Sequence, residues 1–315
     1  MSERTSTLTP EHTPSTAWRG SAPILAASVL WGSTGTAASL APAGTSAAAI
    51  GSAGLALGGL LLFVTGRGHR MRAGVPERWL LLLGAGAVAG YPVTFYPAVA
   101  RTGVAVATVI ALGSAPVFAG LLAWLTGRGR PSARWRAATG LAVIGCAVLV
   151  MGSRFGNATP IDLLGILLAA CAGLTYAVYS LIGGTLITRG HASGSVMGIM
   201  FGVAGVLVLP VVATSDPIWL TTPRGLAVAL HLAFFTTFLA YRLFGYGLRH
   251  TTVASGTTLT LAEPAVAALL GVTVVGERLP VLSWCGLVVL GAGLAVLTFP
   301  VKRRKPLLPT HFRHL

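Results

Sequence analysis

Long apolar runs separated by short polar breaks make up most of the chain. They fall at residues 21–40, 45–65, 79–99, 103–125, 137–152, 161–183, 193–213, 225–247, 252–275 and 281–299. Most of them are near the roughly 20 residues that an α-helix needs to cross a bilayer. The pattern predicts an all-α polytopic membrane protein with ten transmembrane helices.

Composition supports this interpretation and excludes a soluble protein. Hydrophobic residues make up 54% of the 315 residues and charged residues only 9%, whereas soluble domains carry about 25% charged residues. The net charge of +15 does not indicate a nucleic-acid partner, because the basic residues sit in short loops and in the tail. The predicted surroundings of the chain are therefore a lipid bilayer.

The distribution of Lys and Arg predicts the orientation. If the N-terminus lies in the cytoplasm, seventeen basic residues fall in inner segments and four in outer segments, with Arg242 left inside a span. The four outer residues are Arg101, Arg154, Arg224 and Arg278. Cytoplasmic loops carry an excess of Lys and Arg. The count favours a multi-pass protein of the cell membrane, plasma or inner, with both termini in the cytoplasm.

The two ends of the chain differ from its body. Residues 1–18 are rich in Ser, Thr and Pro, which predicts a disordered cytoplasmic tail. Residues 301–315 form a basic cytoplasmic tail. Between them we expect two units, at residues 21–152 and 158–300.

An internal repeat relates these two units. Shifting the chain by about 148 residues places Arg101 on Arg249 and Pro116 on Pro264. Five spans in each unit, an odd number, force the two units into opposite orientations across the membrane. Inverted repeats are typical of secondary transporters, whose binding sites lie where the repeats meet. The fold prediction is therefore two inverted five-helix repeats.

The second unit carries a carboxylate in the middle of a span, Glu263, followed directly by Pro264. An acidic side chain at this depth is costly and normally faces protein or a water-filled cavity. Pro264 cannot donate to the carbonyl of Thr260, so we expect a broken helix with that carbonyl free. The alternative is that Glu263 only holds two helices together and Pro264 is an ordinary kink.

Other candidates for the solute and proton pathway have structural alternatives. Arg242 is either a counter-ion for Glu263 or a side chain that reaches the cytoplasmic interface. Trp31 and Tyr176 either line a cavity or fill the core, and Pro116 is the repeat partner of Pro264. Thr260 either lines the path or bonds back to its own helix. Further tyrosines that could line the same cavity are Tyr91, Tyr96, Tyr179, Tyr241 and Tyr246.

Several functions are excluded or disfavoured. The chain has two lysines, Lys302 and Lys305, both beyond the last span, so its body cannot hold a P-loop. Neither HExxH nor CxxC occurs, and only seven Asp and Glu are present. We therefore predict that the protein is not an enzyme and has neither a cofactor nor a metal site.

Particular motifs resemble the EamA family of the drug/metabolite transporter superfamily. These are LAASVLWGSTG in the first span and LAEPAVAALLGVTVVGERL in the ninth. The resemblance implies ten helices in paired five-helix repeats with both termini cytoplasmic. The first repeat departs from the pattern. Gly127-Arg128-Gly129-Arg130 stands where the family often has Gly-Glu-Arg, and Ala115 stands opposite Glu263.

The resemblance implies a secondary transporter of small metabolites, often an exporter of amino acids or related solutes. The expected mechanism is alternating access, with Glu263 as a candidate proton carrier. Alternatives are an uncoupled facilitator, a drug exporter of the same superfamily, and a non-transporting receptor or assembly subunit. Ten helices in two repeats make a complete pathway, so the chain is expected to act as a monomer or homodimer.

Overall fold

The fold is described from a computed structural model, which covers residues 16–66, 71, 73–152, 162–215, 217–276 and 278–299. Every regular element within these ranges is helical. Of the two predicted tails, residues 1–15 and 301–315 lie outside the described residues. The predicted all-α fold is therefore confirmed for the described part of the chain.

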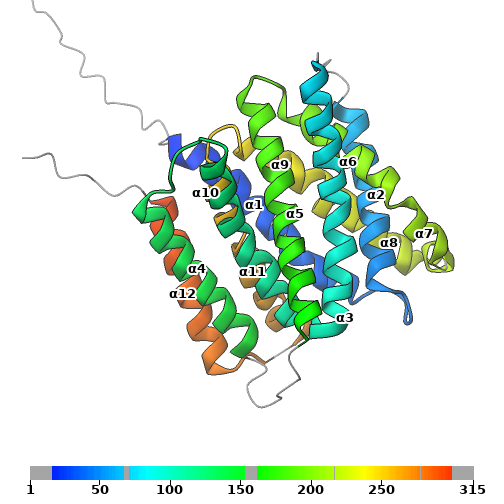
Figure 1. The fold of residues 1–315 in the computed structure, drawn as a ribbon. Helices are drawn as coiled ribbons and strands as arrows, with labels where there is room; N and C mark the ends of the chain where they lie inside the picture. The colour runs from blue at the N-terminus through cyan, green and yellow to red at the C-terminus, as the bar shows by residue number, and fades with distance from the viewer. Residues whose placement is uncertain are drawn as a thin grey trace, which may run out of the picture.

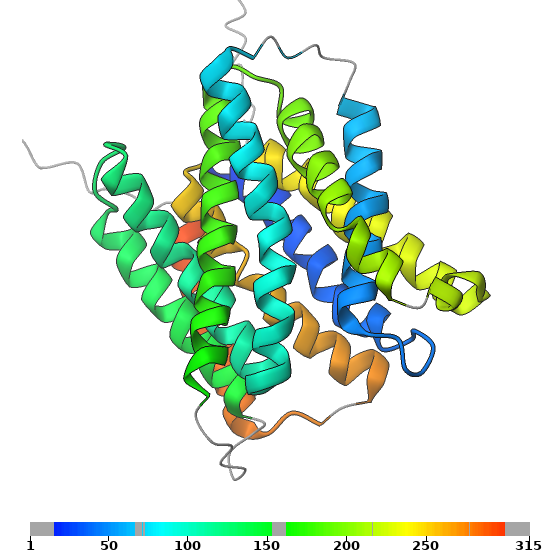
Figure 2. The ribbon, with the colours of Figure 1, turned by 45° about the vertical axis from the view of Figure 1, so that its right-hand side comes forward.

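The first half of the chain forms four helices as they are labelled in Figure 1. They are α1 (Thr16–Ala38), α2 (Ala47–Gly66), α3 (Val75–Leu125) and α4 (Ala133–Gly152). α3 is two helices joined without a loop, because Gly103 has φ 80° and ψ 159°. Glycine adopts this conformation readily because it has no Cβ. The chain reverses there, and Figures 1 and 2 show one arm descending in cyan and the next rising in teal.

The second half contains two long helices and several interrupted ones. The first elements are α5 (Leu163–Thr188), α6 (Ser193–Leu207), α7 (Leu209–Thr214) and the 3₁₀ turn η1 (Pro217–Thr221). Next come α8 (Pro223–His231), the π-helical stretch η2 (Leu232–Leu239) and α9 (Ala240–Gly247). The last are α10 (Val253–Leu259), α11 (Ala262–Leu270), the π-helical η3 (Gly271–Val275) and α12 (Val281–Thr298).

Eight helical segments of the described chain are long and apolar enough to cross a membrane. They include α3 counted once and three segments joined from shorter helices, Ser193–Thr214, Pro223–Gly247 and Val253–Val274. α1, which carries several hydroxyl side chains, is not among the eight. The structure thus supports a polytopic arrangement, while the count of ten spans remains a prediction.

Close backbone contacts join α4 to α12. A Cβ added to Gly145 would lie 2.2 Å from the amide nitrogen of Leu290, and one added to Gly286 would lie 2.2 Å from that of Leu149. No side chain fits at such distances, so the two helices pack with their backbones in contact. This pair joins the first half of the chain to the second (Figure 1).

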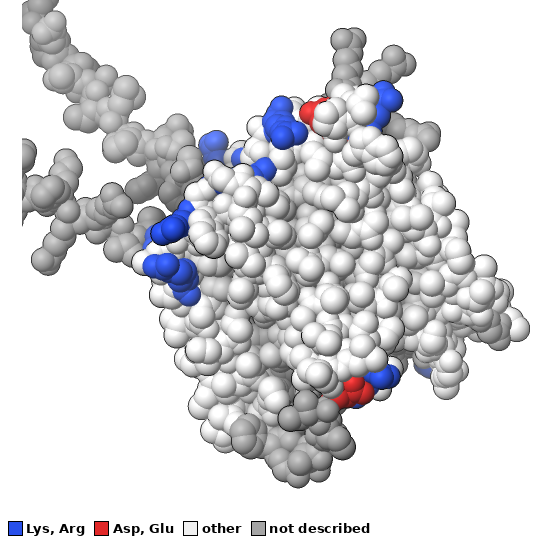
Figure 3. All heavy atoms as spheres, viewed as in Figure 1, with Lys and Arg blue, Asp and Glu red and all other residues white. Residues whose placement is uncertain are grey.

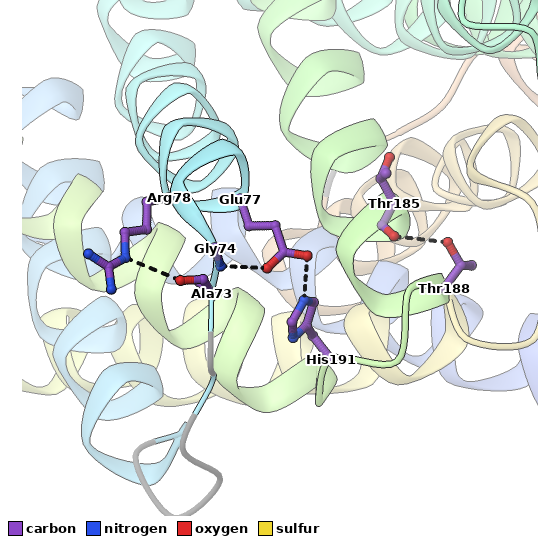
Figure 4. A network of polar contacts seen from close by, with 7 residues as sticks. All are labelled: Ala73, Gly74, Glu77, Arg78, Thr185, Thr188 and His191. Atoms are coloured by element: carbon purple, nitrogen blue, oxygen red, sulfur yellow. Dashed lines mark hydrogen bonds and ion pairs between the residues drawn. The ribbon is translucent and has the colours of Figure 1, made fainter.

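Charged side chains gather at the ends of the helices. On the face in Figure 3 most of the described Arg side chains lie along the upper left edge, and the middle of the face shows no charged side chain. At the end where α3 begins, Glu77 Oε1 lies 3.0 Å from His191 Nε2, and Glu77 Oε2 accepts from the amide of Gly74 at 3.0 Å. Figure 4 shows that this network connects the start of α3 to the α5–α6 loop. At the far end of the first arm of α3, Arg101 pairs with Asp162 at 3.4 Å.

Candidate functional site

The helix that contains Glu263 is interrupted, as the Glu-Pro pair predicts. α10 ends at Leu259 and α11 begins at Ala262. Thr260 and Leu261 have ψ values of −11° and −8°, outside the range of a regular α-helix. The amide of Leu261 donates to Thr258 O at 3.1 Å, which is a three-residue bond instead of the four-residue bond of an α-helix.

The prediction that the carbonyl of Thr260 lacks a hydrogen-bond partner is wrong. Its oxygen accepts from the amide of Glu263 at 3.0 Å, because the tightened turn brings a nearer donor to it. Pro264 follows as the third residue of α11. A proline there costs little, since the first amides of a helix have no partner within the helix. The interruption therefore provides a position where Pro264 fits without breaking an internal hydrogen bond of α11.

Glu263 lies in the first turn of α11, where the helix dipole favours a negative charge. Its side chain lines an internal cavity. Within the described part of the chain its carboxylate makes no hydrogen bond and no ion pair. α1 packs directly against this turn, since a Cβ added to Gly32 would lie 2.7 Å from Val266 Cβ and 3.0 Å from Glu263 O. The carboxylate thus lies at the cavity without a partner among the residues that the structure describes.

The cavity has a volume of about 250 Å³ and is bounded by helices from both halves of the chain. Most of its lining is aromatic or carries a hydroxyl group. The lining residues are Trp31, Thr34, Gly51, Gly54, Leu55, Val88, Tyr91, Pro92, Phe95, Tyr96, Thr108, Leu112, Tyr176, Tyr179, Phe201, Leu232, Thr236, Thr237, Tyr241 and Glu263. A concave pocket lined by aromatic side chains, with polar groups placed among them, is typical of a small-molecule site.

Trp31 is fixed at the cavity by a bond to an unusual stretch of backbone. Its indole Nε1–H donates to the carbonyl of Thr236 at 2.8 Å. That carbonyl is available because η2 is π-helical, so the amide of Ala240 reaches Phe235 O instead. Single π-helical stretches are frequent at functional sites. The predicted residue Trp31 therefore lies at the cavity, and its polar atom is used to hold α1 to η2.

Tyr176 and Thr260, both predicted from the sequence, are brought together. The phenol of Tyr176 donates to Thr260 Oγ1 at 2.9 Å, and Thr260 Oγ1 donates to the carbonyl of Thr257 at 2.8 Å. Thr260 is buried and does not line the cavity. Its hydroxyl thus supports a cavity-lining tyrosine and also bonds back to its own helix.

Two predicted residues lie away from the cavity. Arg242 is exposed, with its Nη1 3.4 Å from Thr65 Oγ1 and its guanidinium 5.9 Å from the ring centroid of Phe238. The structure does not bring it to Glu263. Pro116 is buried within the second arm of α3 and is not part of the cavity lining.

Several lining residues were not identified from the sequence. Thr236 and Thr237 belong to η2, and Thr34 and Thr108 lie on α1 and on the second arm of α3. Nothing in the sequence distinguishes these threonines from the many that bond back to their own helices. Of the further tyrosines that were predicted to line a cavity, Tyr91, Tyr96, Tyr179 and Tyr241 do so. Tyr246 is exposed, and its ring centroid lies 5.1 Å from that of His250.

A sequence model of the EamA-like transporter family matches this chain twice, over residues 18–151 and 163–299. The chain belongs to the EamA-like transporter family. The two matches also confirm the family's two-repeat architecture. Residues Trp31, Tyr176 and Glu263 all fall within the matched ranges.

Comparisons with individual proteins agree with this family assignment. The chain is 36% identical to "Uncharacterized transporter YwfM" of Bacillus subtilis (strain 168) over 292 residues, covering 91% of this chain and 96% of that protein. It is 29% identical to an "Uncharacterized transporter" of Clostridium kluyveri over 129 residues, covering 40% and 41% of the two proteins. A crystal structure matches with a TM-score of 0.74 at 21% identity, covering 89% of this chain and 96% of that chain, which shows the fold alone. The chain is therefore a membrane transporter of the drug/metabolite type.

Proposed function

We propose that this protein is a secondary transporter that exports a small organic solute by alternating access and exchanges protons at Glu263. The observation that carries the proposal is the carboxylate of Glu263, which faces a cavity bounded by both halves without a partner in the described chain. An intramembrane carboxylate that serves only structure is expected to have a hydrogen-bond or ion-pair partner. The resemblance to this family makes amino acids and related solutes, such as amines, the candidate cargo.

The proposal includes a topology of ten membrane spans. Counting the two arms of α3 separately and adding α1 to the segments of membrane-spanning length gives ten spans. They divide into units at residues 21–152 and 158–300 with opposite orientations. The excess of Lys and Arg at one side favours cytoplasmic termini and a cell-membrane location. One chain contains both units, so the proposed unit of function is the monomer.

The position of the cavity supports alternating access. Its lining residues come from the last half of α1, such as Thr34, and from the first half of α2, such as Gly51. The opposite halves of these helices contribute the fully buried Ile24 and Leu62 to the core. In the proposed topology the packed half faces the cytoplasm, and the cavity lies toward the outside. This arrangement corresponds to an outward-facing state in the proposed mechanism.

The experiment is a tolerance and efflux panel in cells that express the wild type, E263Q or E77Q. Glu77 is a matched control because it lies at a helix end and bonds to His191, away from the cavity. The panel contains amino acids, toxic analogues and amines. We expect selective protection by the wild type and E77Q and its loss in E263Q. Equal protection by E263Q, with the same pH dependence, would contradict the role of Glu263.

Proton coupling needs a separate measurement on the solute that the panel identifies. Vesicles that contain the wild type should accumulate this solute against its gradient when a proton gradient is imposed. Equilibration without accumulation would instead identify an uncoupled facilitator.

A further inference from the structure

We propose that the cavity selects solutes that carry one cationic amine on an apolar body and rejects solutes that carry a carboxylate. This inference rests on the proposed transport function and narrows its substrate class. Amino acids and their amine relatives differ by one carboxylate, so the two can be separated by chemistry.

The first step is the charge of the cavity. Glu263 is the one acidic residue of the lining, and no Lys, Arg or His of the described chain lines the cavity. Two basic residues of the second half contact residues other than Glu263. Arg242 is exposed beside Thr65, and His231 Nε2 lies 2.9 Å from Ser33 Oγ. The cavity thus offers a negative charge without a positive one.

A ligand carboxylate would meet this charge without compensation. Two carboxylates in one site of low polarity disfavour each other's charged forms, and a desolvated charge without a partner costs several kcal/mol. The partial positive charge at the start of α11 does not change the balance, because Glu263 occupies that turn itself. An ammonium group supplies the missing opposite charge.

The second step is the aromatic lining. Trp31, Phe201 and Tyr179 surround Tyr241, with ring-centroid distances of 4.9, 3.9 and 6.3 Å. Tyr91 stacks on Phe95 at 5.4 Å and lies 6.3 Å from Tyr176, which in turn lies 5.2 Å from Tyr179. The faces of such rings attract cations, and this attraction grows when water is excluded. The same rings provide apolar surface for the body of an amine.

The third step is the supply of hydrogen-bond acceptors, since an ammonium group only donates. Tyr91 and Tyr96 line the cavity, and their phenol oxygens make no hydrogen bond within the described residues. The phenols of Tyr179 and Tyr241 lie 3.1 Å apart, so one hydroxyl donates to the other and lone pairs remain on both oxygens. Glu263 and these hydroxyls can therefore satisfy an ammonium group from several sides.

The volume sets the size of the solute. About 250 Å³ lies just below the usual range of roughly 300–1,000 Å³ for ligand pockets. Gly51 keeps the space narrow, because its backbone lets the Tyr96 hydroxyl approach within 1.7 Å of where a Cβ would stand. One small amine fits this description better than a drug-sized molecule.

The test measures binding to the full-length protein, purified in detergent, by titration calorimetry. The probes share one aromatic body and are 2-phenylethylamine, phenylalanine, 3-phenylpropionate and 2-phenylethanol. We expect 2-phenylethylamine to bind at least tenfold more tightly than each of the other three. We also expect E263Q to lose at least tenfold in affinity for the amine, while E77Q does not. The proposal is overturned if phenylalanine or 3-phenylpropionate binds as tightly as the amine, or if the amine does not bind.

A second variant tests the charge argument without removing Glu263. In T34K a lysine enters the lining near the end of α1, where its long side chain can place the ammonium group beside the cavity. We expect weaker binding of 2-phenylethylamine and tighter binding of phenylalanine, so that their ratio falls at least tenfold. An unchanged ratio in a folded T34K protein would contradict the proposal.

Transport is measured separately, as flux of radiolabelled 2-phenylethylamine in proteoliposomes. Binding with the expected selectivity but without flux would contradict the proposed function and support the selectivity. Flux of phenylalanine at the rate of the amine would support transport and contradict the selectivity.

Discussion

Pro116 and Pro264 align when one half of the chain is placed on the other, yet the helices around them differ. The second arm of α3 runs from residue 104 to Leu125 without interruption, and Pro116 lies in its interior. Pro264 follows an interruption and lies in the first turn of α11. The residue before each proline differs as well, since Ala115 is fully buried and Glu263 lines the cavity.

A proline alone therefore does not interrupt a helix in this protein. Pro116 cannot donate to the carbonyl of Leu112, and the helix continues regardless. In the second repeat the short turn at Thr260 and Leu261 interrupts the helix, and the amides of Leu261 and Glu263 bond to carbonyls three residues back. The aligned positions thus lie in a continuous helix in one repeat and in an interrupted helix with a carboxylate in the other.

The largest effect is expected from moving a carboxylate into the continuous helix. Ala115 is fully buried, and its amide nitrogen lies 3.3 Å from where a Cβ on Gly173 of α5 would stand. A115E would bury a charge without a partner, which costs several kcal/mol. We expect no folded protein on fluorescence-detected size-exclusion chromatography, whereas A115S gives a normal peak. A monodisperse A115E protein at the wild-type level would show that the first repeat also tolerates a carboxylate.

A smaller effect is expected from the bond between Tyr176 and Thr260, which exists only at the interrupted helix. T260V leaves the buried phenol of Tyr176 without its acceptor, at a cost of about 1–3 kcal/mol in unfolding free energy. Y176F should cost less, because Thr260 Oγ1 still donates to Thr257 O. Unfolding of both single variants and the double variant gives the coupling, which we expect to be about 0.5–1.5 kcal/mol. Strictly additive effects would mean that the bond does not stabilise the interruption.

The smallest effect is expected from the prolines themselves. P264A leaves the turn at Thr260 and Leu261 intact, because the hydrogen bonds that form it involve other residues. We expect a change of less than about 1 kcal/mol in unfolding free energy and retention of most of the transport. P116A is the matched control in the continuous helix, where an added amide can bond to Leu112 O. Loss of transport in P264A to the level of E263Q would show that the proline shapes the site.

The sequence was sufficient for much of the fold because membrane helices follow from the length of apolar runs. The break between the spans at 79–99 and 103–125 was predicted from the apolar runs, and the interruption near Glu263 from the Glu-Pro pair. The free carbonyl at Thr260 was not predicted correctly. A proline removes one donor, but the sequence does not show which nearby amide replaces it.

The cavity was predicted in part. Aromatic residues in the middle of membrane spans are conspicuous, and Trp31 and Tyr176 were identified on that ground. The π-helical stretch η2 was not, because its residues Leu232–Leu239 also fit a regular apolar helix. The position of Arg242 depends on the rotation of α9 about its axis, which is set by packing against α1 and α6. Such rotations follow from tertiary contacts that an apolar sequence does not specify.

The most direct test of a free carboxyl group at Glu263 is labelling by dicyclohexylcarbodiimide, which reacts with protonated carboxyl groups in apolar surroundings. Native membranes would be treated, and the label located by mass spectrometry of the peptides that contain Glu263 and Glu77. We predict label on Glu263, slower labelling as the pH rises, protection by 2-phenylethylamine, and no label at that peptide in E263Q. Absence of label on Glu263 in the folded wild type would contradict an accessible, unpaired carboxyl group and the mechanism built on it.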